Sequence, residues 1–271
     1  MNGILTAPFM REFIQTAANM YRLGWDERNG GNISLLVQED ALKPYICTDS
    51  VIRTVPIGFA ARELWGKYFL VTGTGKYFKN VAQDPERNLG LLRISDDGQK
   101  AELLWGYSDG GRFTSELPAH LMSHAVRLAA DPNHRVVIHC HPTNLIAMTY
   151  IHSLDARDFT RTLWQMSTEC IVVFPDGVNV LPWMLCGTNE IGEATAEKMH
   201  ASRLVVWAQH GIYGAGRDLD ETFGLIETAE KAAEIYMKIA HLPLRQTITD
   251  AQLHVLAEHF GVHPVKNYLD V

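Results

Sequence analysis

Short apolar runs alternate with amphipathic segments along most of this 271-residue chain. Runs that are rich in β-branched residues and bounded by Gly, Pro or Asp are typical of strands, and they lie at 33–37, 68–72, 102–105, 135–139, 170–174 and 204–207. Helical spacing predicts helices at about 115–129, 157–166 and 190–200, near the start up to Gly24, after Asp218, and from Thr249 to Gly261. This alternation predicts an α/β fold, with a central sheet covered by helices.

Composition places the chain among ordinary globular proteins. Hydrophobic residues make up 46% and charged residues 20% of it, which excludes wholesale disorder. A length of 271 residues fits one sizeable α/β domain. Lys plus Arg number 24 and Asp plus Glu number 31, so the formal charge is 24 − 31 = −7. Without basic runs, this balance argues against nucleic acid or an anionic membrane as the main partner.

The sequence shows no targeting or membrane segment. The N-terminus lacks the charged leader and long apolar run of a signal peptide, and no apolar stretch approaches the roughly 18 residues of a membrane helix. The four cysteines (Cys47, Cys140, Cys170 and Cys186) are scattered, with no Cys-x-x-Cys pair. Such usage fits reduced thiols better than disulfides, so we expect a cytoplasmic protein.

Three histidines stand at predicted strand ends. His139 and His141 are two residues apart on one strand, which places them on the same face, and His210 ends another strand-like run. Ligands gather at the carboxyl ends of strands in open α/β sheets, and three imidazoles with an open position are typical of catalytic zinc. The alternative is three separate, hydrogen-bonded histidines, and the spacing alone leaves it open. For His120 and His124, spaced as i and i+4 without the metalloprotease glutamate, we expect ordinary packing.

Three small-polar loops are candidates for holding a phosphate. They are Arg28–Asn32, Thr72–Lys76 and Thr114–Glu116, and each places backbone N–H groups beside hydroxyl or amide side chains. The Thr72–Lys76 loop matches neither a P-loop nor a dinucleotide fingerprint, and each of the three loops taken singly is more typical of a plain turn.

Glu116 is expected in the first turn of a helix capped by Thr114 or Ser115. A glutamate there often only complements the helix dipole, but beside a metal ion it would serve as a general base.

Taken together, these segments resemble the class II aldolase/adducin family. The motifs that carry the resemblance occur in the family's order and span nearly the whole chain: GWDERNGGN at 24–32, VTGTGK at 71–76, TSELPAH at 114–120, HCH at 139–141, STECIVVFPDG at 167–177, QHG at 209–211 and DETFGLI at 220–226. Several dispersed motifs in register are far more specific than any one of them. The resemblance implies a single catalytic domain over residues 1–271, with a mainly antiparallel or mixed sheet.

The resemblance also implies a reaction and a site. The reaction is zinc-dependent, reversible cleavage of L-rhamnulose 1-phosphate to dihydroxyacetone phosphate and L-lactaldehyde in L-rhamnose catabolism. Zinc, one ion per subunit, is implied at His139, His141 and His210, and the principal acid/base role at Glu116. The phosphate is implied near Asn29, Asn32, Thr74, Gly75, Thr114 and Ser115. A fourfold homotetramer with active sites at subunit interfaces is implied as well, where Glu169 of a neighbouring chain assists.

The chemistry agrees with these assignments. Breaking the carbon–carbon bond leaves an enediolate on the ketose fragment, and without an obvious Schiff-base lysine a cation such as zinc must stabilise that charge. Two alternatives remain open: another family enzyme, an epimerase or dehydratase acting on a different sugar phosphate, or a non-catalytic, adducin-like structural domain.

Overall fold

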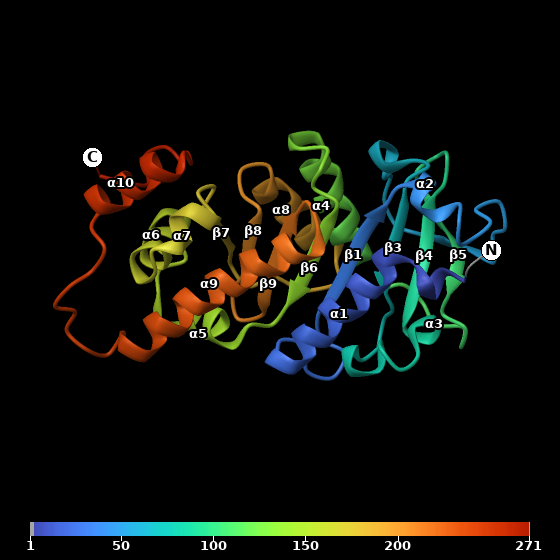
Figure 1. Cartoon of the computed structure of the whole chain (residues 1–271), viewed down its shortest axis with the longest axis horizontal. Coiled ribbons are helices and arrows are strands. Elements are labelled where there is room, and N and C mark those ends of the chain that lie inside the picture. The colour runs from blue at the N-terminus through green and yellow to red at the C-terminus, as the bar shows by residue number, and fades with distance from the viewer. Residues whose placement is uncertain (1–2, 271) are drawn as a thin grey trace.

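The computed structural model describes residues 3–270, and one nine-stranded sheet forms its centre (Figure 1). The strands are β1 (Asn32–Val37), β2 (Arg53–Pro56), β3 (Tyr68–Thr72), β4 (Leu89–Ile94), β5 (Lys100–Gly106), β6 (Val136–Cys140), β7 (Val178–Leu181), β8 (Leu204–Trp207) and β9 (Gly211–Gly216). Their order is β2-β5-β4-β3-β1-β6-β9-β8-β7, and every pair is antiparallel except β7 with β8. This is the mixed, mainly antiparallel sheet that the sequence led us to expect.

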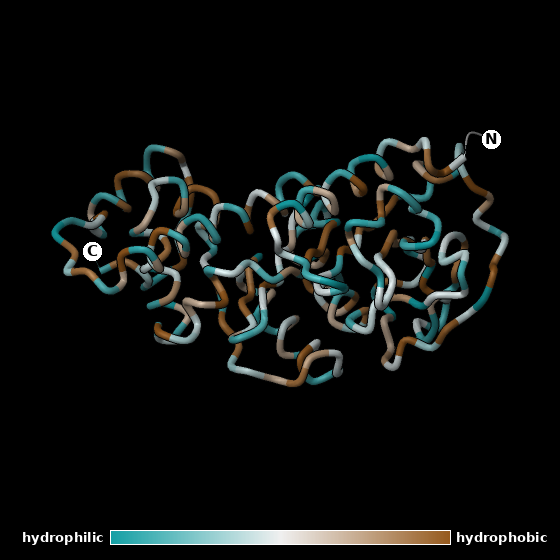
Figure 2. Tube along the Cα trace, turned by 90° about the horizontal axis from the view of Figure 1, so that it is seen from below, coloured by the Kyte–Doolittle hydropathy of each residue, from teal (hydrophilic) through white to brown (hydrophobic). Residues whose placement is uncertain are grey.

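Helices surround this sheet. They are α1 (Pro8–Leu23), α2 (Glu39–Leu42), α3 (Pro85–Asn88), α4 (Leu117–Ala130), α5 (Thr143–Ile151), α6 (Ala156–Met166), α7 (Glu169–Val173), α8 (Asn189–Met199), α9 (Leu219–Ile239) and α10 (Asp250–Phe260), with short 3-10 turns at Ile4–Thr6, Arg62–Leu64 and Phe78–Asn80. The molecule is elongated in both views (Figures 1 and 2), with α10 and β5 toward opposite ends in Figure 1. None of the helices in residues 3–270 has the length and apolar character to span a membrane.

Alternating side chains of the central strands divide the core into two layers. Ile33 and Leu35 of β1 and Ile138 of β6 pack with α1, α5 and α9 on one face of the sheet. The next residues along those strands, such as Leu36 and Val137, turn to the other face, where α4 and α8 cover them. The alternation therefore assigns Ser34 and His139 to the α4 side.

The helix boundaries follow the expected capping signals. α1 has proline at its first position and ends at Gly24, whose φ of 75° is left-handed. At α9 the Asp218 side chain accepts the Glu221 N–H, and α10 opens with a complete capping box between Thr249 and Gln252.

One predicted strand is wrong. Residues 170–174 were expected in the sheet because of their Ile-Val-Val sequence, but Glu169–Val173 forms the short helix α7. Cys170 and Ile171 are buried there, and α7 packs on α6, α9 and α10. A short apolar run buries equally well as a strand or as one helical turn, and packing against neighbouring helices decided between them.

The sequence pattern missed several elements. Strands β2, β4, β7 and β9 and helices α2, α3 and α5 were not expected, and the poorly patterned stretch 38–66 contains α2 and the edge strand β2. β9 has three glycines in six residues, so it lacks the β-branched composition that identifies strands.

Helix α4 is joined to the sheet by buried polar contacts. Ser34 of β1 lies between two histidines of the helix, with its Oγ 2.6 Å from His120 Nδ1 and 2.8 Å from His124 Nε2. All three side chains are fully buried. The packing role expected for His120 and His124 is thus confirmed, with hydrogen bonds that the spacing did not indicate.

These histidines predict an acid-sensitive fold. Burial lowers the pKa of His124 in the folded chain to about 3, from 6.5. Because the unfolded chain binds the proton first as the pH falls, this contribution to stability is complete above pH 6.5 and declines down to about pH 3, at roughly 1.4 kcal/mol per pH unit. A His124→Leu variant should show a pH slope of unfolding free energy shallower by about that amount, measured by urea denaturation between pH 6 and 4. An unchanged slope would show that His124 does not titrate in this way.

Candidate active site

The sheet topology brings four loops that are distant in the sequence to one edge. β1 pairs antiparallel with β6, so that Asn32 lies opposite His139 at the carboxyl end of β6. β3 pairs antiparallel with β1 and ends there too, where the Thr72 hydroxyl accepts the Ile33 N–H at 3.1 Å. β8 runs in the same direction as β6, with β9 between them, and the turn that carries His210 follows its carboxyl end. The loops before β1 and after β3, β6 and β8 therefore meet.

One cavity of about 140 Å³ lies at this edge. Its lining consists of Asn29, Gly30, Gly31, Asn32, Gly73, Thr74, Gly75, Thr114, Ser115, Glu116, His139, His141 and His210. Every site residue expected from the sequence is in this lining except Glu169. Residues up to 181 positions apart in the chain thus share one small polar space.

Neighbouring oxygens determine which ring nitrogen carries the hydrogen in His139 and His141. Nδ1 of His139 lies 3.0 Å from the Ile212 carbonyl, and Nδ1 of His141 lies 3.1 Å from both oxygens of the Glu27 carboxylate. A carbonyl or carboxylate oxygen accepts, so in each ring Nδ1 carries the hydrogen. Nε2 is then the atom with the free lone pair, as in carboxylate–histidine–metal arrangements.

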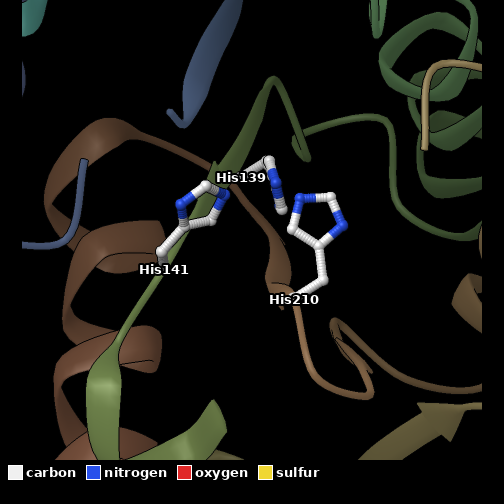
Figure 3. A group of neighbouring side chains, drawn as sticks. All are labelled: His139, His141 and His210. Atoms are coloured by element: carbon white, nitrogen blue, oxygen red, sulfur yellow. The ribbon is translucent and has the colours of Figure 1, made fainter. Parts of the chain in front are cut away.

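These lone pairs point into the cavity without a protein partner. Nε2 of His139 and Nε2 of His141 are both buried and unbonded. The rings of His139, His141 and His210 face one another (Figure 3), with one nitrogen of each within 4.8 Å of the others. Burial lowers the pKa of His139 and His210, which keeps both imidazoles neutral. Three ring nitrogens this close together, two of them buried without a hydrogen-bond partner, fit a divalent metal such as zinc.

Two glycines leave room for this cluster. A Cβ on Gly211 would lie 2.3 Å from the Cys140 carbonyl oxygen and 2.9 Å from the His141 ring. One on Gly30 would lie 2.7 Å from the same ring. Contacts below 3 Å force a shift, so both positions require glycine for His141 to hold its place.

Glu116 lines the same cavity as the three histidines. Its side chain is buried, and Oε2 accepts hydrogen bonds from Asn32 Nδ2 at 3.0 Å and from the Tyr213 hydroxyl at 2.9 Å. The same oxygen lies 3.7 Å from His139 Nε2. The carboxylate is therefore held directly beside the three-histidine cluster.

The start of helix α4 differs from the expectation. The sequence suggested that Thr114 or Ser115 caps the helix with Glu116 in its first turn. Instead α4 begins at Leu117 and Glu116 itself is the cap residue, while the Thr114 hydroxyl accepts the Glu116 N–H at 3.3 Å. Pro118 in the first turn lacks an N–H and has a fixed φ, which suits the helix start one residue before it. Glu116 consequently lies just before the first turn of α4, where it lines the cavity.

Glu169 lies outside this cavity. It is the first residue of α7, its side chain is exposed, and the Ser167 hydroxyl donates to it at 2.5 Å, which lowers the pKa of the Glu169 carboxyl. It lines a different hollow with Trp25 and Glu230. Within one chain Glu169 and the histidine cluster are therefore in separate places.

The chain matches the family model described as Class II Aldolase and Adducin N-terminal domain over residues 11–237. The match covers most of the chain. This chain belongs to the class II aldolase and adducin family.

Individual members of the family are similar over nearly the full length. The chain is 60% identical over 269 residues to rhamnulose-1-phosphate aldolase of Enterococcus faecalis, with 99% of this chain and 96% of the relative covered. It is 59% identical over 268 residues to the enzyme of the same name from Listeria monocytogenes serotype 4b, with 98% of both covered. A sugar-phosphate aldolase from Thermotoga maritima has the same fold, with a TM-score of 0.75, 29% identity, and coverage of 87% of this chain and 96% of that one.

Sequence reasoning missed three residues of this class II aldolase site. Glu27 orients His141, Tyr213 donates to Glu116, and the exposed Cys186 thiol lies within 4.8 Å of Glu116 and His210 ligand atoms. Glu27 belongs to the GWDERNGGN motif at 24–32. Its position directly before the Arg-Asn-Gly-Gly loop was the one feature of the sequence that could have pointed to it. For Tyr213 and Cys186 the sequence carried no signal, because only the fold brings β9 and the loop after β7 to the site.

The glycine beside the cluster gives a direct test of the site. Gly211→Ala should displace His139 or His141 and lower zinc content at least tenfold, measured by atomic emission on dialysed protein. The matched control is Gly224→Ala in α9, where an added Cβ meets nothing within 4 Å and helix propensity favours alanine. Equal zinc contents in the two variants would contradict the assigned cluster.

Proposed function

We propose that this class II aldolase is a zinc-dependent rhamnulose-1-phosphate aldolase. It would cleave L-rhamnulose 1-phosphate reversibly to dihydroxyacetone phosphate and L-lactaldehyde. The observation that carries the proposal is a buried carboxylate beside two histidine nitrogens whose lone pairs have no protein partner. The substrate follows from the name shared by relatives that are 59–60% identical over nearly the whole chain.

The metal would be held by His139, His141 and His210 through ring nitrogens. When bound, zinc supplies Lewis-acid stabilisation for the negative charge that develops on the ketose fragment. The contribution of the protein is to orient the rings of His139 and His141 and to fix which nitrogen of each carries the hydrogen. Glu27 and the Ile212 carbonyl do this by accepting the Nδ1 hydrogens.

Glu116 is the proposed acid/base residue. In the cleavage direction the hydroxyl that becomes the aldehyde loses a proton, and the carbon of the ketose fragment gains one. Asn32 and Tyr213 both donate to Oε2 of Glu116, and neither bond uses Oε1. Oε1 is therefore the atom we assign to this proton transfer.

The phosphate would lie among the loops of Asn29, Thr74, Gly75, Thr114 and Ser115. They line the cavity together with the metal cluster, and the N-terminus of α4 adds a favourable dipole for an anion. Asn32 lines the same cavity and remains a proposed contact through its second amide hydrogen, since its first is donated to Glu116.

The assembly and cellular setting belong to the same proposal. We propose the homotetramer of single-domain subunits that the family resemblance implies, in which Glu169, which lies outside the cavity of its own chain, reaches the cavity of a neighbouring chain. All four cysteines are free, which agrees with a reducing, cytoplasmic environment.

An aldolase assay with L-rhamnulose 1-phosphate tests the function. The purified protein should release dihydroxyacetone phosphate, detected by coupled reduction, and should lose this activity on chelation and regain it with zinc. His141→Ala should lose zinc and activity together. Conversion of the substrate to an epimer or a dehydrated product would assign a different family reaction, and zinc-loaded protein without turnover on sugar phosphates would support the structural alternative.

Mixing two inactive variants tests the shared site. Glu116→Ala and Glu169→Ala should each retain zinc and lose roughly 10²-fold or more in kcat. Because the two changes would fall on different chains of one site, mixed oligomers should regain about a quarter or more of wild-type activity after subunit exchange. If exchange is verified by mass and no activity returns, Glu169 does not act across an interface.

A further inference from the structure

A chain of buried polar side chains continues behind Glu116 into the interior. Asn32 donates to Glu116, and its Oδ1 is in short contact with Nε2 of His120. Nδ1 of His120 lies 2.6 Å from Ser34 Oγ, which in turn lies 2.8 Å from Nε2 of His124. All five side chains are at least 92% buried. The catalytic assignments above use only the first two of them.

The carboxylate at one end fixes the direction of every hydrogen bond in this chain. Glu116 accepts, so the amide nitrogen of Asn32 faces it and Oδ1 of Asn32 faces His120. Oδ1 accepts as well, so Nε2 of His120 carries a hydrogen. Burial keeps this ring neutral by lowering its pKa to about 3, which leaves Nδ1 without a hydrogen.

The hydrogen bonds farthest from Glu116 agree with this direction. With a bare Nδ1 on His120, the Ser34 hydroxyl must donate to it, and the Ser34 oxygen must accept from Nε2 of His124. His124 is then the Nε2–H tautomer with a bare Nδ1. That Nδ1 is indeed buried and unpartnered. Leaving a nitrogen lone pair unbonded costs less free energy than leaving an N–H donor unbonded. The series of hydrogen bonds therefore ends at the group whose missing partner is least unfavourable.

We propose that His120, oriented by Ser34 and His124, is a positioning residue that holds the Asn32 amide with its nitrogen toward Glu116. The inference rests on the proposed function, in which Glu116 moves the proton. His120 does not touch the cavity and acts through Asn32.

The physical need for this residue lies in the symmetry of the amide. The two ends of the Asn32 side chain are nearly equal in shape, so packing alone does not select which end faces Glu116. A flipped amide would present an oxygen to a carboxylate oxygen and remove one of the two donors on Oε2. The N–H of His120 excludes the flip, because Nδ2 of Asn32 would then meet another donor.

Paired serine substitutions test the proposal. Ser34→Ala breaks the chain in its middle while changing little volume, and it leaves His120 free to exchange its ring hydrogen between nitrogens. Ser123→Ala is the matched control, since Ser123 lies buried on the same helix α4 and its hydroxyl has no partner. Ser34→Ala should lower kcat roughly tenfold with zinc content unchanged, and Ser123→Ala should change neither kcat nor zinc content.

Two substitutions at His120 add a rescue. His120→Gln retains an amide donor near the position of Nε2 and should keep kcat within about threefold of wild type. His120→Phe has no donor and should lower kcat tenfold or more. In a Glu116→Ala background, His120→Phe should cause no further loss, because the effect passes through Glu116.

The outcomes separate the possibilities. An inactive wild-type protein refutes the proposed function before any variant is compared. Wild-type activity with equal kcat for Ser34→Ala and Ser123→Ala overturns the positioning role, as does a full additional loss in the Glu116→Ala background. If His120→Phe does not fold, the serine pair and His120→Gln decide. Neutron diffraction of deuterium-exchanged crystals gives a readout independent of activity: deuterium on Nε2 of both histidines supports the proposal, and deuterium on Nδ1 of His120 overturns it.

Discussion

The antiparallel pairing of β1 with β6 is the constraint on which the candidate site depends. It sets Asn32 directly opposite His139, so that the polar start of one strand meets the histidine-bearing end of the other. β3 on one side and β9 on the other continue the same ladder. Each adds a loop or a side chain at this edge. A slip of one residue in the β1–β6 register would turn Asn32 and Ser34 to the α1 side of the sheet and separate Glu116 from its donor.

Several polar side chains next to the site are buried between the sheet and α4. A polar layer runs from the cavity into the space between the sheet and α4, where apolar packing is the common solution. Its cost is offset because most donors and acceptors have a partner. The bare nitrogens are Nε2 of His139, Nε2 of His141 and Nδ1 of His124. The arrangement holds the Glu116 carboxylate beside three imidazoles with two hydrogen bonds. Such fixed placement suits the proton transfer proposed for Glu116.

Much of the fold and of the site was predictable from particular residues. The first long helix ends at Gly24 and the last begins after Thr249, as the sequence predicted. His139, His141, His210 and Glu116 were identified as candidates, and they line one cavity. The Cys170–Phe174 segment shows the limit of such reasoning. Its β-branched residues favour a strand in isolation, yet neighbouring helices offered the apolar surface that it buries as α7.

The sequence by itself determined the chemical types at the site, the alternation of strands and helices, and the caps that begin and end the main helices. These depend on interactions between residues only a few positions apart, and the chain order records them directly. The tertiary structure alone decided that Glu27 accepts from His141, that Tyr213 and Asn32 hold Glu116, and that His120 joins Asn32 to Ser34. The two residues in each of these contacts are separated by between 84 and 114 positions in the sequence. Their formation depends on strand register and on which face of the sheet each helix covers, and no local pattern in the chain encodes either.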